Sequence, residues 1–270
     1  MIFEAVVSSV VGACLCGLLG FYVSRLGLST LAFTVAHAAL AGAAVALMLG
    51  LDMTYSAMIF SIITAVTLGL LYDRLPHAMD SVCMVLFSFF NAVALLAIYY
   101  SNAVVLATAS VSAVLWGSVL AVTKEKLIML AGIAAVFTLY LIACRKHVDT
   151  ILFDKRVAEA EGMNVALHIT ALLVLASLSL SMMLRIVGGF LVFTLLYVPT
   201  ALASSLQLSM KGQYVTIPAF ATLSTLAGLG ASFTLDLPVG VSIALTTVVT
   251  AAAVKAVAAV IERSRMLKEG

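Results

Sequence analysis

Charged side chains are scarce in this sequence. Asp, Glu, Lys and Arg make up only 10% of the 270 residues, whereas hydrophobic residues make up 64% and the mean hydropathy is +1.23. Soluble domains carry about 25% charged residues, so the composition excludes an ordinary soluble protein. The formal net charge of +2 also excludes the strongly basic surface that is typical of nucleic-acid binding.

Sequence motifs for catalysis are missing as well. The chain has no Gly-x-x-x-x-Gly-Lys-Ser/Thr loop, so it cannot hydrolyse ATP by that route. It also has no His-Glu-x-x-His, Gly-x-Ser-x-Gly or Cys-x-x-Cys pattern. The four cysteines lie within or at the ends of apolar runs, where packing is their expected role. We therefore expect neither enzymatic activity nor a permanently bound cofactor.

Long apolar segments are what the chain does contain. Segments of about 20 apolar residues, the length that crosses a bilayer core of about 30 Å as a helix, recur along the chain. The short alternating segments of a membrane β-barrel are absent from the sequence. We predict an all-α, polytopic membrane protein of about 8–10 transmembrane helices, which form a single transmembrane domain over 1–270. The expected spans cover 3–24, 30–50, 54–72, 79–100, 126–144, 165–184, 187–206, 214–232 and 238–260.

The segment 103–122 is ambiguous. It is apolar enough to cross but rich in Ala, Ser and Thr, so we favour a re-entrant or broken helix buried among other spans. With nine full crossings, most Lys and Arg residues fall on one side, which the positive-inside rule makes cytoplasmic. These basic positions are Arg25, Arg74, the group from 145 to 156, Lys211 and the group from 263 to 268. The N-terminus is then external, whereas a full crossing of 103–122 would place it inside.

A polar interruption, which ends at Gly162, lies near the middle of the chain. Asp154 is a suitable N-cap for a helix, and Gly162 is placed as its C-terminal cap. Phe153, Val157 and Ala160 follow at helical spacing and would form one apolar stripe. The pattern predicts an amphipathic helix of about two turns, at about 153–162, that lies across the cytoplasmic mouth of the bundle. An ordinary surface loop with one helical turn is the alternative.

The same residues resemble a known family motif. Phe153-Asp154, followed by Ala158, Ala160 and Gly162, is similar to the coupling-helix motif of the permease subunits of zinc, manganese and iron ABC importers, the ABC-3 metal permease family. Further segments resemble that family's motifs in the same order along the chain. They are 37–42 (HAALAG), 115–120 (LWGSVL), 187–192 (VGGFLV) with its continuation 196–201 (LYVPTA), and 235–240 (LDLPVG).

The resemblance implies a transport function that is energised by a partner. Such permeases form homodimers in the cytoplasmic membrane, with two copies of a cytoplasmic ATP-binding subunit and an extracytoplasmic metal-binding protein. The segment from Asp154 to Gly162 would dock on the ATPase, and the cargo would be a divalent ion of zinc, manganese or iron. Pro199 would kink its span and suit a moving gate, while Gly188 and Gly189 would allow close helix packing. A stand-alone secondary transporter or channel and a permease for a metal chelate are the alternative functions.

His37 is the candidate metal ligand. A histidine inside a span is costly unless it is paired or faces a polar cavity, and imidazole is the commonest protein ligand for transition metals. A helix-packing role, with a hydrogen bond to a neighbour, is the alternative. The resembled family carries an Asp four residues before this His, but Phe33 stands there in this sequence and cannot ligate a metal. Three explanations remain open: a softer or different metal, a chelated metal with no direct ligation, or ligands from another span such as Asn91 or Cys83.

Overall fold

The structure is a computed structural model that describes residues 2–72, 74–75, 77–101 and 122–269. Over these residues the chain folds into helices and connecting turns. The helices are α1 (Ile2–Arg25), α2 (Ser29–Leu49), α3 (Met53–Tyr72), α4 (Met79–Tyr100), α6 (Lys124–Ala143), α7 (Arg145–Phe153), α8 (Lys155–Ala160), α9 (Val165–Val187), α10 (Gly189–Ser205), α11 (Met210–Leu235) and α12 (Val239–Glu269). The segment 103–122, for which the sequence favours a re-entrant or broken helix, lies outside the described residues except for Val122.

Eight of the described helices are long and apolar enough to cross a membrane. They are α1, α2, α3, α4, α6, α9, α11 and α12, and α10 contributes a shorter apolar helix, Leu191–Ser205. Each predicted span coincides with one of these helices to within about four residues at either end, a scatter typical of helix boundaries, except that α12 continues to Glu269. The prediction of an all-α, polytopic membrane protein is therefore confirmed.

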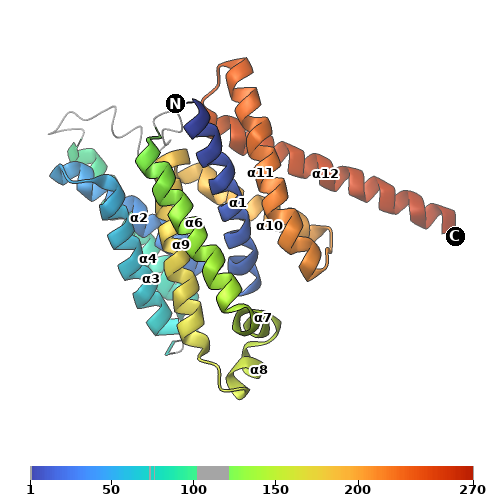
Figure 1. Ribbon diagram of the computed structural model, residues 1–270, viewed down its shortest axis with the longest axis horizontal. Coiled ribbons are helices and arrows are strands. Elements are labelled where there is room, and N and C mark those ends of the chain that lie inside the picture. Colours follow the sequence, from blue (N-terminus) through green and yellow to red (C-terminus); the bar gives the residue numbers. More distant parts are fainter. Residues whose placement is uncertain (1, 73, 76, 102–121, 270) are drawn as a thin grey trace.

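The helices form a bundle in which α1 and α9 lie between two groups of helices (Figure 1). On one side, α2 packs against α3 and α4, and α3 packs against α9. On the other side, α1 contacts α10 and α11, while α12 contacts both of those helices and then extends away from the body. The α2–α3 contact is close because a Cβ at Gly42 would lie only 2.7 Å from the carbonyl oxygen of Ser56. Small residues allow such close approach between membrane helices.

Contacts between distant segments show which helix ends lie together. At the end of the bundle that carries α8, Arg25 Nε donates to Gln213 Oε1 (3.0 Å). At the same end, Lys155 Nζ donates to the carbonyl oxygen of Leu26 (2.9 Å). At the opposite end, Nη1 of Arg185 lies 3.5 Å from the sulfur of Met53. The first turn of α11 and the start of α8 are therefore neighbours of the α1–α2 turn.

Basic residues are concentrated at the α8 end. The described positions there are Arg25, Arg74, Arg145, Lys146, Lys155, Arg156 and Lys211, whereas Lys124, Lys126 and Arg185 lie at the opposite end. The expected group from 263 to 268 is not at the α8 end, because it lies, with Lys255, on the part of α12 that extends away from the body (Figure 1). Because Lys and Arg mark the cytoplasmic side of membrane proteins, we infer that the α8 end is cytoplasmic. α4 ends and α6 begins at the other end of the bundle, where the N-terminus also lies (Figure 1). This arrangement agrees with the external N-terminus expected from nine crossings.

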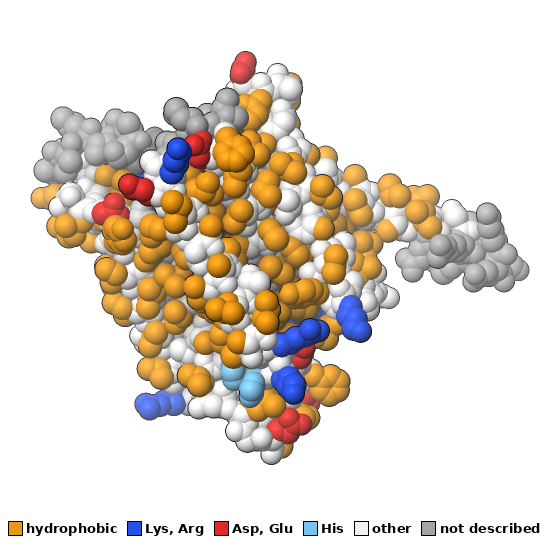
Figure 2. Space-filling view, viewed as in Figure 1, with side chains coloured by type: hydrophobic (Ala, Val, Ile, Leu, Met, Phe, Trp, Pro, Cys, Tyr) orange, Lys and Arg blue, Asp and Glu red, His pale blue; other side chains and the backbone are white. Residues whose placement is uncertain are grey.

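The surface and the interior of the bundle differ in the expected way. Figure 2 shows hydrophobic side chains over the middle of one face, with charged and histidine side chains gathered toward its upper and lower ends. Inside, buried serines bond to carbonyl groups of their own helix; for example, Ser179 Oγ donates to the Leu175 carbonyl oxygen (2.8 Å). A membrane offers no water to satisfy such hydroxyl groups, so these local bonds are what permits small polar residues in the core.

Candidate functional site

The polar interruption folds into two short helices rather than one. α7 covers Arg145–Phe153 and α8 covers Lys155–Ala160, and the residue between them, Asp154, has extended backbone angles (φ −159°, ψ 121°). Phe153 therefore ends α7, and the prediction that it shares one helix with Val157 and Ala160 is wrong. The physical reason lies at Asp154, because an N-cap residue leaves helical geometry and so separates the helix before it from the helix after it.

Both predicted caps of α8 are confirmed. The Asp154 carboxylate accepts a hydrogen bond from the backbone N–H of Arg156 (2.8 Å). At the other end Gly162 has φ +78°, its N–H donates to the Glu159 carbonyl oxygen (3.0 Å), and the Met163 N–H donates to the Ala158 carbonyl oxygen (3.0 Å). Glycine adopts this left-handed conformation without steric penalty, which is why it closes the helix here.

The two faces of α8 differ in exposure. Ala158 is fully buried, whereas Phe153 is 81% exposed, Val157 is 40% exposed and Ala160 is also exposed. The three residues of the predicted apolar stripe, Phe153, Val157 and Ala160, are thus all exposed, although two helices contribute them. A short capped helix that presents apolar side chains outward at the end of a membrane bundle is suited to docking on a second protein.

Lys155 anchors α8 to the membrane-spanning helices. Its ammonium group donates to the Leu26 carbonyl oxygen at the end of α1, contacts the Tyr72 hydroxyl at the end of α3, and lies 4.9 Å from the centre of the Tyr72 ring. Movement of α8 would therefore be transmitted to α1 and α3. Sequence reasoning missed this lysine because its partners lie 129 and 83 positions away along the chain.

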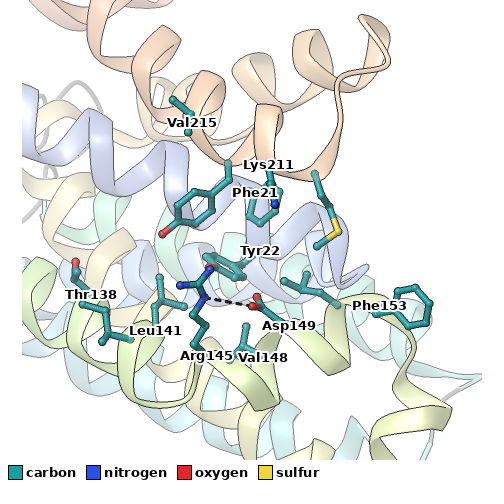
Figure 3. Close-up of a pocket in the computed structure, with 14 residues that line it drawn as sticks. Phe21, Tyr22, Thr138, Leu141, Arg145, Val148, Asp149, Phe153, Lys211 and Val215 are labelled. Carbon is teal, nitrogen blue, oxygen red and sulfur yellow. Dashed lines mark ion pairs between the residues drawn. The ribbon is translucent and has the colours of Figure 1, made fainter.

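An open cavity of about 560 Å³ lies beside α7, between α1, α6 and α11 (Figure 3). The aromatic rings of Phe21 and Tyr214 meet edge to face across it, with centroids 5.7 Å apart. An exposed ion pair on α7, between Arg145 Nε and Asp149 Oδ2 (3.5 Å), lines the opposite wall. Phe153 stands at the rim and points away from the other labelled side chains (Figure 3). The cavity is thus lined mainly by aliphatic and aromatic side chains.

His37 lies in a cluster of aromatic rings from three helices. The centroid of its ring is 4.5 Å from Phe33 on α2, 4.5 Å from Phe87 on α4 and 5.3 Å from Phe193 on α10. All four side chains are half-buried. His37 Nδ1 lies 2.9 Å from the carbonyl oxygen of Phe33, so this nitrogen carries the proton that it donates, and Nε2 keeps its lone pair. The imidazole can therefore offer one nitrogen to a ligand.

The other two candidate ligands, Asn91 and Cys83, lie on α4, the helix that also carries Phe87. Asn91 uses its side-chain amide to donate to the Phe87 carbonyl oxygen (3.0 Å). Cys83 is fully buried, and its carbonyl oxygen accepts from Thr34 Oγ1 (3.1 Å). Among the described residues, no group of three His, Cys, Asp or Glu side chains is placed to hold a metal ion. The ring contacts of His37 are thus with three aromatic side chains.

The proposed gating and packing residues lie at the junction of α9 and α10 (Gly188 and Gly189) and within α10 (Pro199). Gly188 separates the two helices with φ 93°, Gly189 begins α10, and Pro199 is buried within α10. Leu196 lies about one turn before Pro199 in α10. A Cβ at Gly20 of α1 would lie only 2.2 Å from the Leu196 carbonyl oxygen. Sequence reasoning missed Gly20, which allows α1 and α10 to approach closely.

Comparison with known proteins gives consistent matches over nearly the whole chain. The sequence profile of the ABC 3 transport family matches residues 1–259. The manganese transport system membrane protein MntC of Listeria monocytogenes is 27% identical over 247 residues, which cover 91% of this chain and 86% of MntC. The manganese import system permease protein ScaB of Streptococcus parasanguinis is 24% identical over 248 residues, which cover 91% of this chain and 86% of ScaB. The probable iron transport system membrane protein of Haemophilus influenzae is 25% identical over 242 residues, which cover 90% of this chain and 88% of that protein.

Solved structures share the same fold. The structure of PsaBC from Streptococcus pneumoniae in complex with a Fab aligns with a TM-score of 0.78 at 24% identity, covering 94% of this chain and 89% of that chain. An inward-facing conformation of a putative metal-chelate type ABC transporter aligns with a TM-score of 0.73 at 18% identity, covering 90% and 81%. The arrangement of helices seen here is thus an established membrane-transport fold.

Proposed function

Because this chain belongs to the ABC 3 transport family, we propose that it is the permease subunit of an importer that moves zinc, manganese or iron across the cytoplasmic membrane. Relatives named for manganese and iron transport support this cargo class. The whole chain acts as one permease domain in a homodimer. An extracytoplasmic metal-binding protein delivers the cargo, and the metal is a transported substrate rather than a resident cofactor.

The observation that carries the proposal is α8. The chain has no phosphate-binding loop of its own, yet it presents a capped helix with an exposed apolar stripe at the cytoplasmic end. We infer that two cytoplasmic ATP-binding subunits, one for each permease, receive this helix in a groove. Phe153 supplies an exposed apolar contact, while Asp154 and Gly162 hold the ends of the helix. Closure of the ATPase then moves α8, and Lys155 passes the movement to α1 and α3, which makes α8 the shared element of an allosteric device.

The aromatic cluster favours a second candidate cargo, a metal chelate. A free divalent ion that gives up its water needs several protein ligands. The rings that surround His37, those of Phe33, Phe87 and Phe193, cannot ligate a metal ion. In a chelate the organic ligand already surrounds the metal and offers apolar or aromatic surface to these rings. A free ion would instead need further ligands, supplied by the second copy of His37 in a homodimer or by side chains on α4.

Reconstituted transport distinguishes the two cargoes. The permease, its ATP-binding subunit and its metal-binding protein would be placed in liposomes, and uptake of free Mn²⁺, Zn²⁺ and Fe²⁺ would be compared with uptake of the same metals bound to small organic chelators. We expect His37→Ala to reduce uptake of the true cargo at least tenfold, while His77→Ala, on an exposed turn, leaves it unchanged. Equal uptake by wild type and His37→Ala would exclude a role for His37 in the transport path.

A further inference from the structure

Two histidines lie together at the cytoplasmic end, far along the chain from His37. The ring centroids of His147, on α7, and His168, on α9, are 5.0 Å apart, and their planes differ by 24°. His147 is exposed and His168 is half-buried, so solutes on the cytoplasmic side can reach both rings. Figure 2 shows neighbouring histidine side chains on the surface near the lower end of this face.

The separation of the two ring centres fits a shared metal ion, although the rings are stacked as they stand, so the exposed His147 ring would have to rotate about its Cβ–Cγ bond to direct a nitrogen at the ion. Imidazole nitrogens bind Zn²⁺ at about 2.1 Å, and two imidazoles on one tetrahedral ion then have ring centres roughly 5 Å apart. The Tyr140 hydroxyl lies 2.9 Å from His168 Nδ1 and so holds this ring in place. Because Nδ1 is engaged by Tyr140, Nε2 is the nitrogen of His168 that would bind the ion. An oxygen partner on the second nitrogen is the usual support of a histidine that ligates a metal.

We propose that His147 and His168 form a second metal site, distinct from the cargo path, that binds a divalent transition-metal ion such as Zn²⁺ on the cytoplasmic side. In the part of the chain that the structure describes, no third His, Cys, Asp or Glu completes a ligand set with this pair. Water fills the remaining coordination positions. Such a site exchanges its ion readily, which suits a sensor of cytoplasmic metal better than a structural role.

The position of the pair gives the site a consequence for transport. α7 joins α6 to α8, and the residue that separates α6 from α7, Cys144, has non-helical angles (φ −100°, ψ 17°). A metal ion shared by His147 and His168 would tie α7 to the first turn of α9. The α7–α8 segment would then be less free to follow the ATPase, so bound metal would slow uptake. This consequence rests on the proposed transport function, whereas the metal site itself does not.

Metal binding can be measured without transport. The full-length permease with His37→Ala, which removes the cargo-side imidazole, would be placed in lipid nanodiscs and titrated with Zn²⁺ against a chromogenic chelator. We expect one Zn²⁺ site, which is lost when His147→Ala or His168→Ala is added and retained when His77→Ala is added. Tyr140→Phe should weaken binding by about 10–100-fold, because His168 loses its oxygen partner. Equal Zn²⁺ affinity in all these proteins would overturn the site, and monodisperse elution of each variant would exclude misfolding as the cause of a loss.

Regulation is tested in liposomes that contain the ATP-binding subunit, with Zn²⁺ added on the ATP side. Uptake of the cargo by wild type and by His77→Ala should fall as Zn²⁺ rises, while His147→Ala should resist the same concentrations. If Zn²⁺ slows wild type and His147→Ala equally, the ion acts on the ATPase and the regulatory role is wrong. A preparation with no ATP-dependent uptake at all would contradict the proposed function, but the binding titration would still decide whether the metal site exists.

Discussion

Single residues decide whether α8 keeps its shape. Asp154 and Gly162 close the two ends of a helix of six residues, a length that is unstable by itself in water. Lys155 and buried Ala158 attach this helix to the bundle. The geometry of α8 therefore depends on a few side chains and on one glycine with a positive φ.

Replacement of Gly162 tests this dependence. A Cβ at Gly162 would meet nothing within 4 Å, but φ is +78°, so Gly162→Ala strains the backbone by roughly 1–2 kcal/mol without a clash. We expect reduced ATP-driven uptake with normal membrane insertion. Gly132→Ala is the matched control, because that position also has open space and lies within α6. Uptake that is unchanged in Gly162→Ala would mean that the C-cap of α8 does not matter for transport.

Phe33 determines what His37 can bind. Phe33→Asp would place a carboxylate four residues before His37, on the same helix face, where the two groups can share one cation. We expect tighter Zn²⁺ binding in a competition titration of the purified permease, together with lower thermal stability, because a carboxylate in a span costs about 2.5–3.5 kcal/mol. Phe33→Asn, which is polar but uncharged, is the control. Equal Zn²⁺ affinity of the Asp and Asn variants would show that no cation reaches this position.

At the scale of the helix, the sequence predicted some elements well and others poorly. Segments of about 20 apolar residues located the spans, because length and hydropathy are local properties. α7 was missed, since its nine residues mix four charged or histidine side chains with the buried Val148 and Ile151. The caps of α8 were predictable from Asp154 and Gly162. The aromatic cluster around His37 was not predictable, because it forms where α2, α4 and α10 pack together. The spacing of residues within one helix carries no information about which other helices that helix contacts.

The exposed stripe of α7 and α8 gives a prediction at this scale. Phe153→Ser removes the most exposed apolar side chain of the stripe, so the permease should fold normally but retain much less ATP-binding subunit on co-purification. Leu75→Ser is the control, because Leu75 is 43% exposed on the α3–α4 turn at the same end of the bundle. Equal retention of the ATPase by the two variants would place the docking surface elsewhere.

At the scale of the whole molecule, the cytoplasmic end combines three features. The apolar stripe of α7 and α8 faces outward, Lys155 connects α8 to α1 and α3, and His147 and His168 connect α7 to α9. The opposite end has fewer basic residues and carries the N-terminus. This asymmetry separates the place where energy enters from the aromatic cluster inside the membrane. Allosteric coupling between ATP hydrolysis and cargo transport requires two distinct sites, and this asymmetry provides them.

The central claim is that this permease is driven through α8 by a separate ATPase. The most direct test measures metal uptake into liposomes that contain the permease with and without its ATP-binding subunit, each with ATP, with no nucleotide and with a non-hydrolysable analogue. We predict uptake against a concentration gradient only when the ATPase and hydrolysable ATP are both present. Equally fast accumulation without the ATP-binding subunit would identify a stand-alone transporter and contradict the account.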